Sequence, residues 1–161
     1  MISRLTEKNI QTRLLVWTLD VKKHILAIPN STTVFYWECD LLSVTRARLA
    51  HEFEIKRNMS DFKADKRKRS KHMNLELGPI GKCPNYFWYV TCDFDIEPPE
   101  YAGWIKYLDT GRNKPMQIMK KEAPKLHGEH VPDRDLETMG RIACYRMKDL
   151  FVKYHSPKKL T

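Results

Sequence analysis

The chain has 161 residues, of which 42% are hydrophobic and 11% aromatic, and this composition excludes a disordered segment and indicates one folded domain with its own core. Its 29 lysines and arginines exceed its 20 acidic residues, and the formal net charge of +9 favours a polyanionic partner, nucleic acid first. No apolar run is long enough to span a bilayer.

The residues Met1–Arg4 show no signal-peptide pattern, and the four cysteines form no CxxC pair. We therefore expect a cytoplasmic protein with reduced thiols, no membrane partner and a single domain over residues 1–161.

The first predicted element is a helix from a Thr6 cap to about Lys22. Its apolar residues recur at i, i+4, i+7 and i+11, and they are Ile10, Leu14, Trp17 and Val21. Glu7 lies in the first turn, where the helix dipole favours a carboxylate. After this helix we predict a short strand at His24–Ile28 and a turn at Pro29–Ser31.

Two adjacent strands are predicted next, at Thr33–Val44 and Leu49–Arg57, joined by a turn near Thr45–Arg48. Both are strongly apolar, which indicates a central strand pair. The apolar residues are Val34, Phe35, Tyr36, Leu41, Leu42, Phe53 and Ile55.

Acidic residues recur along one face of each strand in this pair. Side chains alternate along a strand, so Glu52, Glu54 and Lys56 share one face, and Glu38 and Asp40 share a face of the preceding strand. If the two faces coincide, the carboxylates repel one another unless a divalent cation binds, and such oxygen ligands suit Mg²⁺ or Mn²⁺. The alternative is that this alternation marks a solvated sheet face.

A second helix is predicted after a cap at Ser60 and Asp61, and a basic run follows: Lys63, Lys66, Arg67, Lys68, Arg69 and Lys71. Because the run directly follows the acidic strands, we expect it to grip phosphates. A solvated helix face or a localisation signal is the alternative.

Three further strands are predicted at Tyr86–Cys92, Gly103–Leu108 and Met116–Lys120. The loop Asp93–Tyr101 joins the first two, and Asp109–Asn113 makes a hairpin of the second two. Their aromatic residues are predicted to lie in the sheet core: Tyr86, Trp88, Trp104 and Tyr107.

The remaining segments are a loop, a histidine-containing stretch and a closing helix. Gly78–Pro84 is predicted to be a loop, and His127–His130 is too short and glycine-containing to favour a metal site. An apolar stripe marks the closing helix as core or as the face of a homodimer: Leu136, Met139, Ala143, Met147, Leu150 and Tyr154.

The order helix, three strands, helix, strand, with Asp40 followed by Glu54-Ile55-Lys56 on the adjoining strand, resembles the PD-(D/E)XK nuclease superfamily. The stretches ECDLLSV, HEFEIKRNMSDFKADKRKRSKH, CPNYFWYV, PPEYAGWIKY and KKEAPKLH look like small MmcB-like proteins of bacteria and phages. The resemblance spans roughly residues 5–130 and implies an α/β, restriction-endonuclease-like open mixed β-sheet flanked by helices. The arrangement is also similar to archaeal Holliday-junction resolvases, in which a first-helix glutamate, here Glu7, joins the site.

The chain departs from these families at three points. Cys39 stands where the superfamily name has proline. The helix after Lys56 lacks the tyrosine and glutamine of the exonuclease branch, which argues against a processive exonuclease. MmcB-like proteins carry an aromatic residue near the position of Lys68, whereas the run here is wholly basic, and this leaves the substrate open.

The resemblance implies a metal-dependent DNA nuclease. Asp40, Glu54 and the backbone carbonyl of Ile55 would hold Mg²⁺ or Mn²⁺. Lys56 would position the attacking water and stabilise the developing charge. Candidates for a second metal or for outer-shell waters are Glu7, Glu38 and Glu52. The side chains expected to bind flanking phosphates are Arg57, Lys63, Lys66 and Arg67.

The predicted role is endonucleolytic cleavage in DNA repair, recombination or phage DNA processing, in the cytoplasm of a bacterial or phage-infected cell, with RNA as an alternative substrate. A non-catalytic nucleic-acid-binding module on the same fold is the competing class, although such a module need not retain Asp40, Glu54 and Lys56. A basic scaffold protein is a third class, for which clustered carboxylates have no use.

Overall fold

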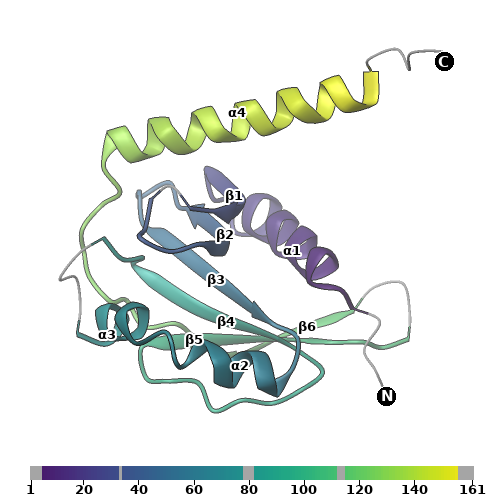
Figure 1. The fold of residues 1–161 in the computed structure, drawn as a ribbon, viewed down its shortest axis with the longest axis vertical. Helices are drawn as coiled ribbons and strands as arrows, with labels where there is room; N and C mark the ends of the chain where they lie inside the picture. The colour runs from purple at the N-terminus through teal and green to yellow at the C-terminus, as the bar shows by residue number, and fades with distance from the viewer. Residues whose placement is uncertain (1–4, 33, 78–81, 112–114, 156–161) are drawn as a thin grey trace.

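The structure is a computed structural model that describes residues 5–32, 34–77, 82–111 and 115–155. Within these ranges the chain forms one six-stranded sheet in the order β1-β2-β3-β4-β5-β6, with helices against it (Figure 1). The strands are β1 Leu26–Ser31, β2 Cys39–Val44, β3 Ala50–Lys56, β4 Tyr86–Cys92, β5 Ala102–Leu108 and β6 Met116–Lys121. The helices are α1 Glu7–Val16, α2 Met59–Asp65, α3 Arg69–Leu77 and α4 Asp133–His155, with a π-helical extension of α1 at Trp17–Val21.

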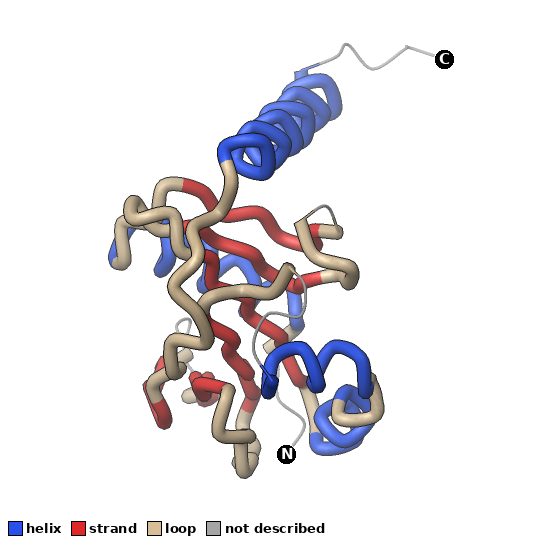
Figure 2. The backbone as a smooth tube through the Cα atoms, turned by 90° about the vertical axis from the view of Figure 1, so that its left-hand side faces the viewer, coloured by secondary structure: helices blue, strands red, loops and turns tan. Residues whose placement is uncertain are grey.

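The sheet is open and mixed, which confirms the predicted fold class of an α/β protein with helices flanking such a sheet. Strands β1, β2 and β3 are antiparallel neighbours, β3–β4 and β4–β5 pair in parallel, and β5–β6 is antiparallel. The parallel step from β3 to β4 requires a crossover, and α2 and α3 supply it (Figure 1). Figure 2 shows helical segments in blue on both sides of the strands, which are red.

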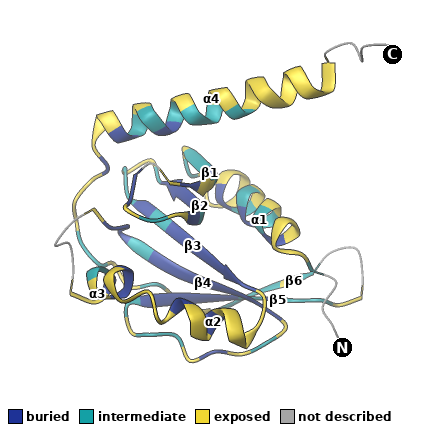
Figure 3. Ribbon diagram, in the orientation of Figure 1, coloured by how far each residue is buried: buried dark blue, intermediate teal, exposed yellow. Residues whose placement is uncertain are grey.

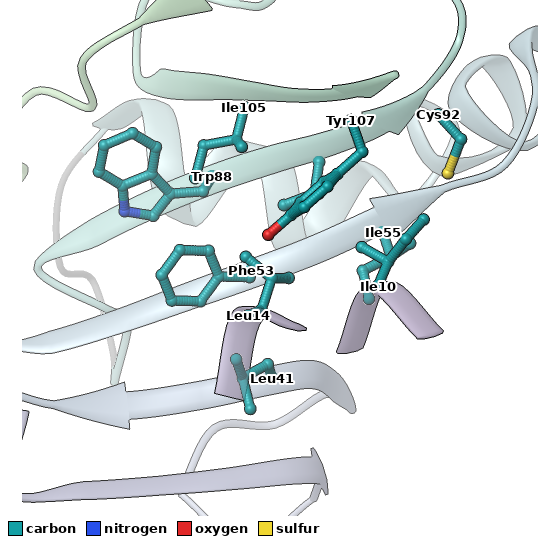
Figure 4. Packing of buried hydrophobic residues seen from close by; sticks show 10 residues of the cluster. Ile10, Leu14, Leu41, Phe53, Ile55, Trp88, Cys92, Ile105 and Tyr107 are labelled. Atoms are coloured by element: carbon teal, nitrogen blue, oxygen red, sulfur yellow. The ribbon is translucent and has the colours of Figure 1, made fainter. Parts of the chain in front are cut away.

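One face of the sheet packs against α1. Ile10 and Leu14 of α1 are fully buried and contact Leu41 and Phe53 in a cluster that continues to Trp88 (Figure 4). The Thr6 cap predicted from the sequence is confirmed: its hydroxyl accepts a hydrogen bond from the Asn9 backbone N–H at 3.2 Å. The i, i+4 spacing of Ile10 and Leu14 therefore positions the helix, whereas Val21 of the predicted stripe is exposed.

The opposite face is covered by α2 and α3. Phe62 of α2 and Leu75 of α3 pack with Phe87 and Tyr89 of β4. The parallel strands β3, β4 and β5 are consequently buried on both faces (Figure 3), as is typical of parallel strands beneath crossover helices. Of the aromatic residues assigned to the core, Trp88, Trp104 and Tyr107 are buried and Tyr86 is half-buried.

Two predicted boundaries near the first strand are wrong. Pro29–Ser31 belong to β1 and pair with β2 instead of forming a turn. Proline is tolerated there because β1 is an edge strand, where a missing N–H costs no hydrogen bond between strands. Residues 34–37 form bends, so β2 begins only at Cys39.

These bends have a packing cause. Val34 and Phe35 are buried, and the ring of Phe35 stacks on that of Trp37 with centroids 5.6 Å apart. The segment folds against its own aromatic residues instead of extending the sheet. It contains part of the predicted strand Thr33–Val44, of which Thr33 lies outside the described residues.

The single basic helix predicted after β3 is also wrong. Two short helices form, with α2 capped by Asn58, whose Oδ1 accepts from the Asp61 N–H at 2.9 Å, and not by Ser60 or Asp61. The chain turns at Lys66 and Arg67 before α3 begins at Arg69. The break allows residues on both helices to face the sheet.

The remaining strand predictions are close to the structure. β4 has the predicted bounds, β5 begins one residue earlier and β6 ends one residue later. Parts of the predicted loop Gly78–Pro84 and hairpin Asp109–Asn113, namely residues 78–81 and 112–113, lie outside the described residues.

Helix α4 is longer than the surface it covers (Figure 3). Met139 is fully buried and packs with half-buried Leu136 against the β1–β2 end of the sheet, so this half of the predicted stripe is core. Met147, Leu150 and Tyr154 of the same stripe are exposed. None of the described helices is long and apolar enough to cross a membrane.

Candidate functional site

The end of the β2–β3 pair brings three of the predicted catalytic residues together. Leu41 lies directly across from Phe53, so Asp40 and Glu54 occupy the next positions on neighbouring strands. Asp40 Oδ2 accepts the backbone N–H of Ile55 at 2.6 Å, and Lys56 Nζ lies 2.7 Å from Glu54 Oε1. The motif residues therefore form one site on the face covered by α2 and α3.

Asp40 is the carboxylate at this site that its neighbours neutralise least. Burial, followed by the charge of Glu54, raises the pKa of Asp40 to about 7, while the Ile55 N–H opposes the shift. Glu7 raises the same pKa further and Lys56 lowers it. Glu7, exposed in the first turn of α1, thus acts on Asp40 through its charge, and the role at the site that the resemblance to the resolvases implied stays a prediction.

Glu54 is held differently, because both of its oxygens face lysines. It is 4% exposed; Oε1 lies 2.7 Å from Lys56 Nζ and Oε2 lies 2.8 Å from Lys71 Nζ. Lys71 belongs to α3 and is itself 3% exposed. A patch expected to require a divalent cation thus already contains cations of the protein.

Glu52, expected among the outer-shell candidates, is fully buried and engaged. Its oxygens accept the Trp37 Nε1–H at 3.0 Å, and Oε1 lies 2.8 Å from Lys71 Nζ. Glu38 is exposed and precedes β2, so the predicted sharing of a strand face with Asp40 is wrong. The bends at residues 34–37 are the reason.

Asp65 is a buried carboxylate of the site that the sequence prediction did not include. Its Oδ2 accepts the Tyr89 hydroxyl at 2.8 Å and lies 3.1 Å from His72 Nε2. Although burial opposes ionisation, the contacts with His72, Lys71 and the neighbouring lysines hold the pKa of Asp65 below its usual range. Asp65 is therefore an ionised member of the buried cluster.

The sequence prediction missed three residues of the site for one reason: Lys71, Asp65 and His72. A lysine inside a basic run has the pattern of a solvated helix, and only the break between α2 and α3 turns Lys71 inward. Burial of a lysine among carboxylates has no sequence signature of its own. The excess of acidic residues on β3 was the available signal, since buried charges require partners.

The predicted phosphate-binding residues lie on the surface above this cluster. Arg57, Lys63, Lys66 and Arg67 are all exposed, in the bend after β3, on α2 and in the turn that follows α2. Lys66 Nζ lies 4.8 Å from the centroid of the Phe62 ring. The four cations are free to meet a polyanion next to the Asp40–Glu54 end of the strands.

Asp40 fits a hard divalent cation, and Glu54 fits it conditionally. Asp40 is half-buried beside two further carboxylates, and its pKa is raised. A bound cation would lower that pKa again. Glu54 would have to exchange one lysine contact for the metal. In the described part of the chain, no group of three or more histidine, cysteine or acidic side chains is arranged to hold an ion.

Comparison with known proteins adds the fold and nothing further. No protein-family model and no curated protein match the chain. A solved structure from Silicibacter pomeroyi, described as a protein of unknown function, is similar over 99% of this chain and 100% of that chain, with a TM-score of 0.62 and 12% identity. At this identity the similarity shows a shared fold across the whole chain.

Proposed function

We propose that the protein is a metal-dependent nuclease that hydrolyses phosphodiester bonds, most directly as an endonuclease on DNA in the bacterial or phage-infected cytoplasm. The observation that carries the proposal is the adjacency of Asp40 and Glu54 on β2 and β3, with Lys56 Nζ 2.7 Å from Glu54 Oε1. Burial and the charge of Glu54 also raise the pKa of Asp40 to about 7. A bound cation would stabilise the ionised form of this carboxylate. Its neighbours Glu54 and Lys56 complete the residue motif of a phosphodiesterase.

Each residue has one task in this proposal. Asp40 and Glu54, with the Ile55 carbonyl, would hold Mg²⁺ or Mn²⁺, which when bound would supply a Lewis acid for the scissile phosphate. Lys56 orients the attacking water and stabilises the charge that develops on the phosphoryl oxygens. The water oxygen forms the new bond to phosphorus and releases a proton to solvent, while the P–O bond to the leaving sugar oxygen breaks and that oxygen takes up a proton from solvent.

The surface above the site supports a nucleic-acid substrate. The exposed cations of the α2 region would contact phosphates flanking the cleaved bond: Arg57, Lys63, Lys66 and Arg67. These contacts do not depend on base identity, so the proposal does not include sequence specificity. RNA has the same phosphates and is the alternative substrate.

A non-catalytic nucleic-acid-binding module is the second candidate, and one observation favours it. Both oxygens of Glu54 are engaged, by Lys56 at 2.7 Å and Lys71 at 2.8 Å, so the protein itself neutralises the carboxylate that a metal would use. On this alternative the buried ions hold α3 against β3, and only the basic surface is functional.

Incubation with labelled single-stranded, duplex and branched DNA and with RNA distinguishes the two candidates. The nuclease proposal predicts products with Mg²⁺ or Mn²⁺, none with a chelator, and none from Asp40→Asn with either metal. Binding of the same substrates without cleavage under every condition would favour the module.

A further inference from the structure

Lys68 belongs both to the buried ion cluster and to the basic surface. It lies between α2 and α3, with Nζ 3.0 Å from Asp65 Oδ1 and 3.6 Å from Glu54 Oε1. Its side chain is nevertheless 56% exposed. A cation in this position can contact the carboxylates or a ligand outside the protein.

The other two lysines of the cluster lack this freedom. Lys56 is 6% exposed and Lys71 is 3% exposed, and each lies 2.7–2.8 Å from a glutamate oxygen. Their short contacts and burial fix them to β3 and α3. Lys68 is thus the most exposed lysine of the described cluster, and the one that a flanking backbone phosphate can meet at the surface.

Lys68 lies against a buried carboxylate oxygen of Asp65. Among the described side chains, Asp65 Oδ1 is buried without a hydrogen bond of good geometry, and its charged neighbours are Lys68 at 3.0 Å and Lys56 at 3.2 Å. The distances are those of ion pairs. When Lys68 leaves, the cluster loses one positive charge.

The charges of the cluster show what such a departure does. Lys68 is paired with Asp65 at 3.0 Å and with Glu54 at 3.6 Å. Its withdrawal removes one positive charge from beside these carboxylates, next to Asp40. A divalent cation at Asp40 and Glu54 would then be bound more strongly.

We propose that Lys68 couples nucleic-acid binding to metal binding: a backbone phosphate draws its ammonium group away from Glu54 and Asp65, and the site then binds a divalent cation more tightly. The inference rests on the proposed nuclease function and adds a regulation of its site, because metal and substrate each favour the other. Coupling between two binding sites is reciprocal, so bound metal must strengthen DNA binding by the same factor.

The test uses Mn²⁺ alone and a fluorescent single-stranded 12-mer as probes. Mn²⁺ affinity is measured by calorimetry without DNA, and DNA affinity by anisotropy with chelator and with saturating Mn²⁺. Lys68→Ala is compared with Lys63→Ala, an exposed lysine of α2 in the same basic region, and with Lys68→Arg, which keeps the cation. Thermal melting confirms that each variant is folded.

We expect Lys68→Ala to bind Mn²⁺ roughly tenfold more tightly than the wild type without DNA, and to lose the strengthening of DNA binding by Mn²⁺. Lys63→Ala should weaken DNA binding but keep the wild-type Mn²⁺ affinity and coupling, and Lys68→Arg should resemble the wild type. Equal Mn²⁺ affinity of Lys68→Ala and Lys63→Ala would overturn the coupling role alone. Absence of Mn²⁺ binding by the wild type would instead reject the proposed function and this inference with it.

Discussion

Lys71 Nζ lies 2.8 Å from Glu54 Oε2, and this ion pair joins α3 to β3 in the interior of the protein. The same ammonium lies 2.8 Å from Glu52 Oε1 and 5.0 Å from the centroid of the Phe87 ring. A resident lysine therefore provides the positive charge that the acidic strand requires. Any divalent ion at the site has to bind beside it.

Removal of Lys71 should destabilise the fold, since two buried glutamates would lose their shared cation. We expect Lys71→Met to lower the free energy of unfolding by about 3–5 kcal/mol. The double variant Lys71→Met/Glu52→Gln removes one charge of each sign and should recover part of that loss. Urea unfolding with Lys63→Met as the exposed control measures both effects, and a single variant as stable as its control would contradict the assigned ion pairs.

Loss of the basic surface should weaken nucleic-acid binding without altering preference among sequences. Charge reversal of Lys63, Lys66 and Arg67 removes three exposed cations, so the affinity should fall and its dependence on salt concentration should flatten. Anisotropy titrations of two unrelated DNA sequences at several salt concentrations test this. An unchanged affinity and slope would show that these residues form a solvated face only.

Acidification should destabilise the protein through His51, which lies on the α1 face of the sheet. Burial, followed by the charges of His24 and Lys22, lowers the pKa of His51 to about 3. Below the unfolded pKa of about 6.5, the unfolded chain binds a proton at His51 that the folded protein does not bind. The free energy of unfolding therefore decreases as the pH is lowered from about 6.5 toward 3.

The contribution of His51 between pH 7 and pH 5 should be about 2 kcal/mol. His51→Gln does not titrate there and still offers an acceptor to the Trp88 Nε1–H, which His51 Nδ1 accepts at 3.1 Å. Denaturant unfolding at the two pH values should therefore show a smaller pH effect in the variant. The same loss of stability in both proteins would show that another group is responsible.

The fold could be predicted where side-chain patterns report directly on burial. Continuous aromatic and β-branched residues gave the bounds of β4, and the Thr6 cap and apolar spacing gave the start of α1. The end of β1 could not be predicted from local residues, because proline in a strand is acceptable only at a sheet edge. Edge position is a property of the whole topology.

The candidate site was predicted in part for the same reason. Strand alternation placed Glu54 and Lys56 on one face, and the contact at 2.7 Å agrees with it. Asp65 and Lys71 come from helices whose break and inward rotation depend on tertiary packing. A buried lysine and a surface lysine are identical in a basic run, so the sequence favoured the commoner exposed state.

The second half of α4 should contribute little to the stability of a single chain. Phe151 is 62% exposed, so Phe151→Glu should change the free energy of unfolding by less than about 0.5 kcal/mol. Met139 is fully buried, and Met139→Ala should cost about 2–5 kcal/mol.

Sedimentation of the wild type and Phe151→Glu tests the predicted homodimer. A dimer that the substitution dissociates would assign this helix face to a second copy, and a concentration-independent monomer would rule that out.

Calorimetric titration with Mn²⁺ of the wild type and Asp40→Asn at pH 8 tests the metal site most directly. Asparagine keeps an oxygen to accept the Ile55 N–H and removes the charge of a carboxylate whose pKa is raised to about 7, so the variant should fold normally. We expect Mn²⁺ binding by the wild type, with the affinity reduced at least ~10-fold in Asp40→Asn. Equal binding by the two proteins, or none by the wild type, would contradict a metal centre at Asp40 and Glu54.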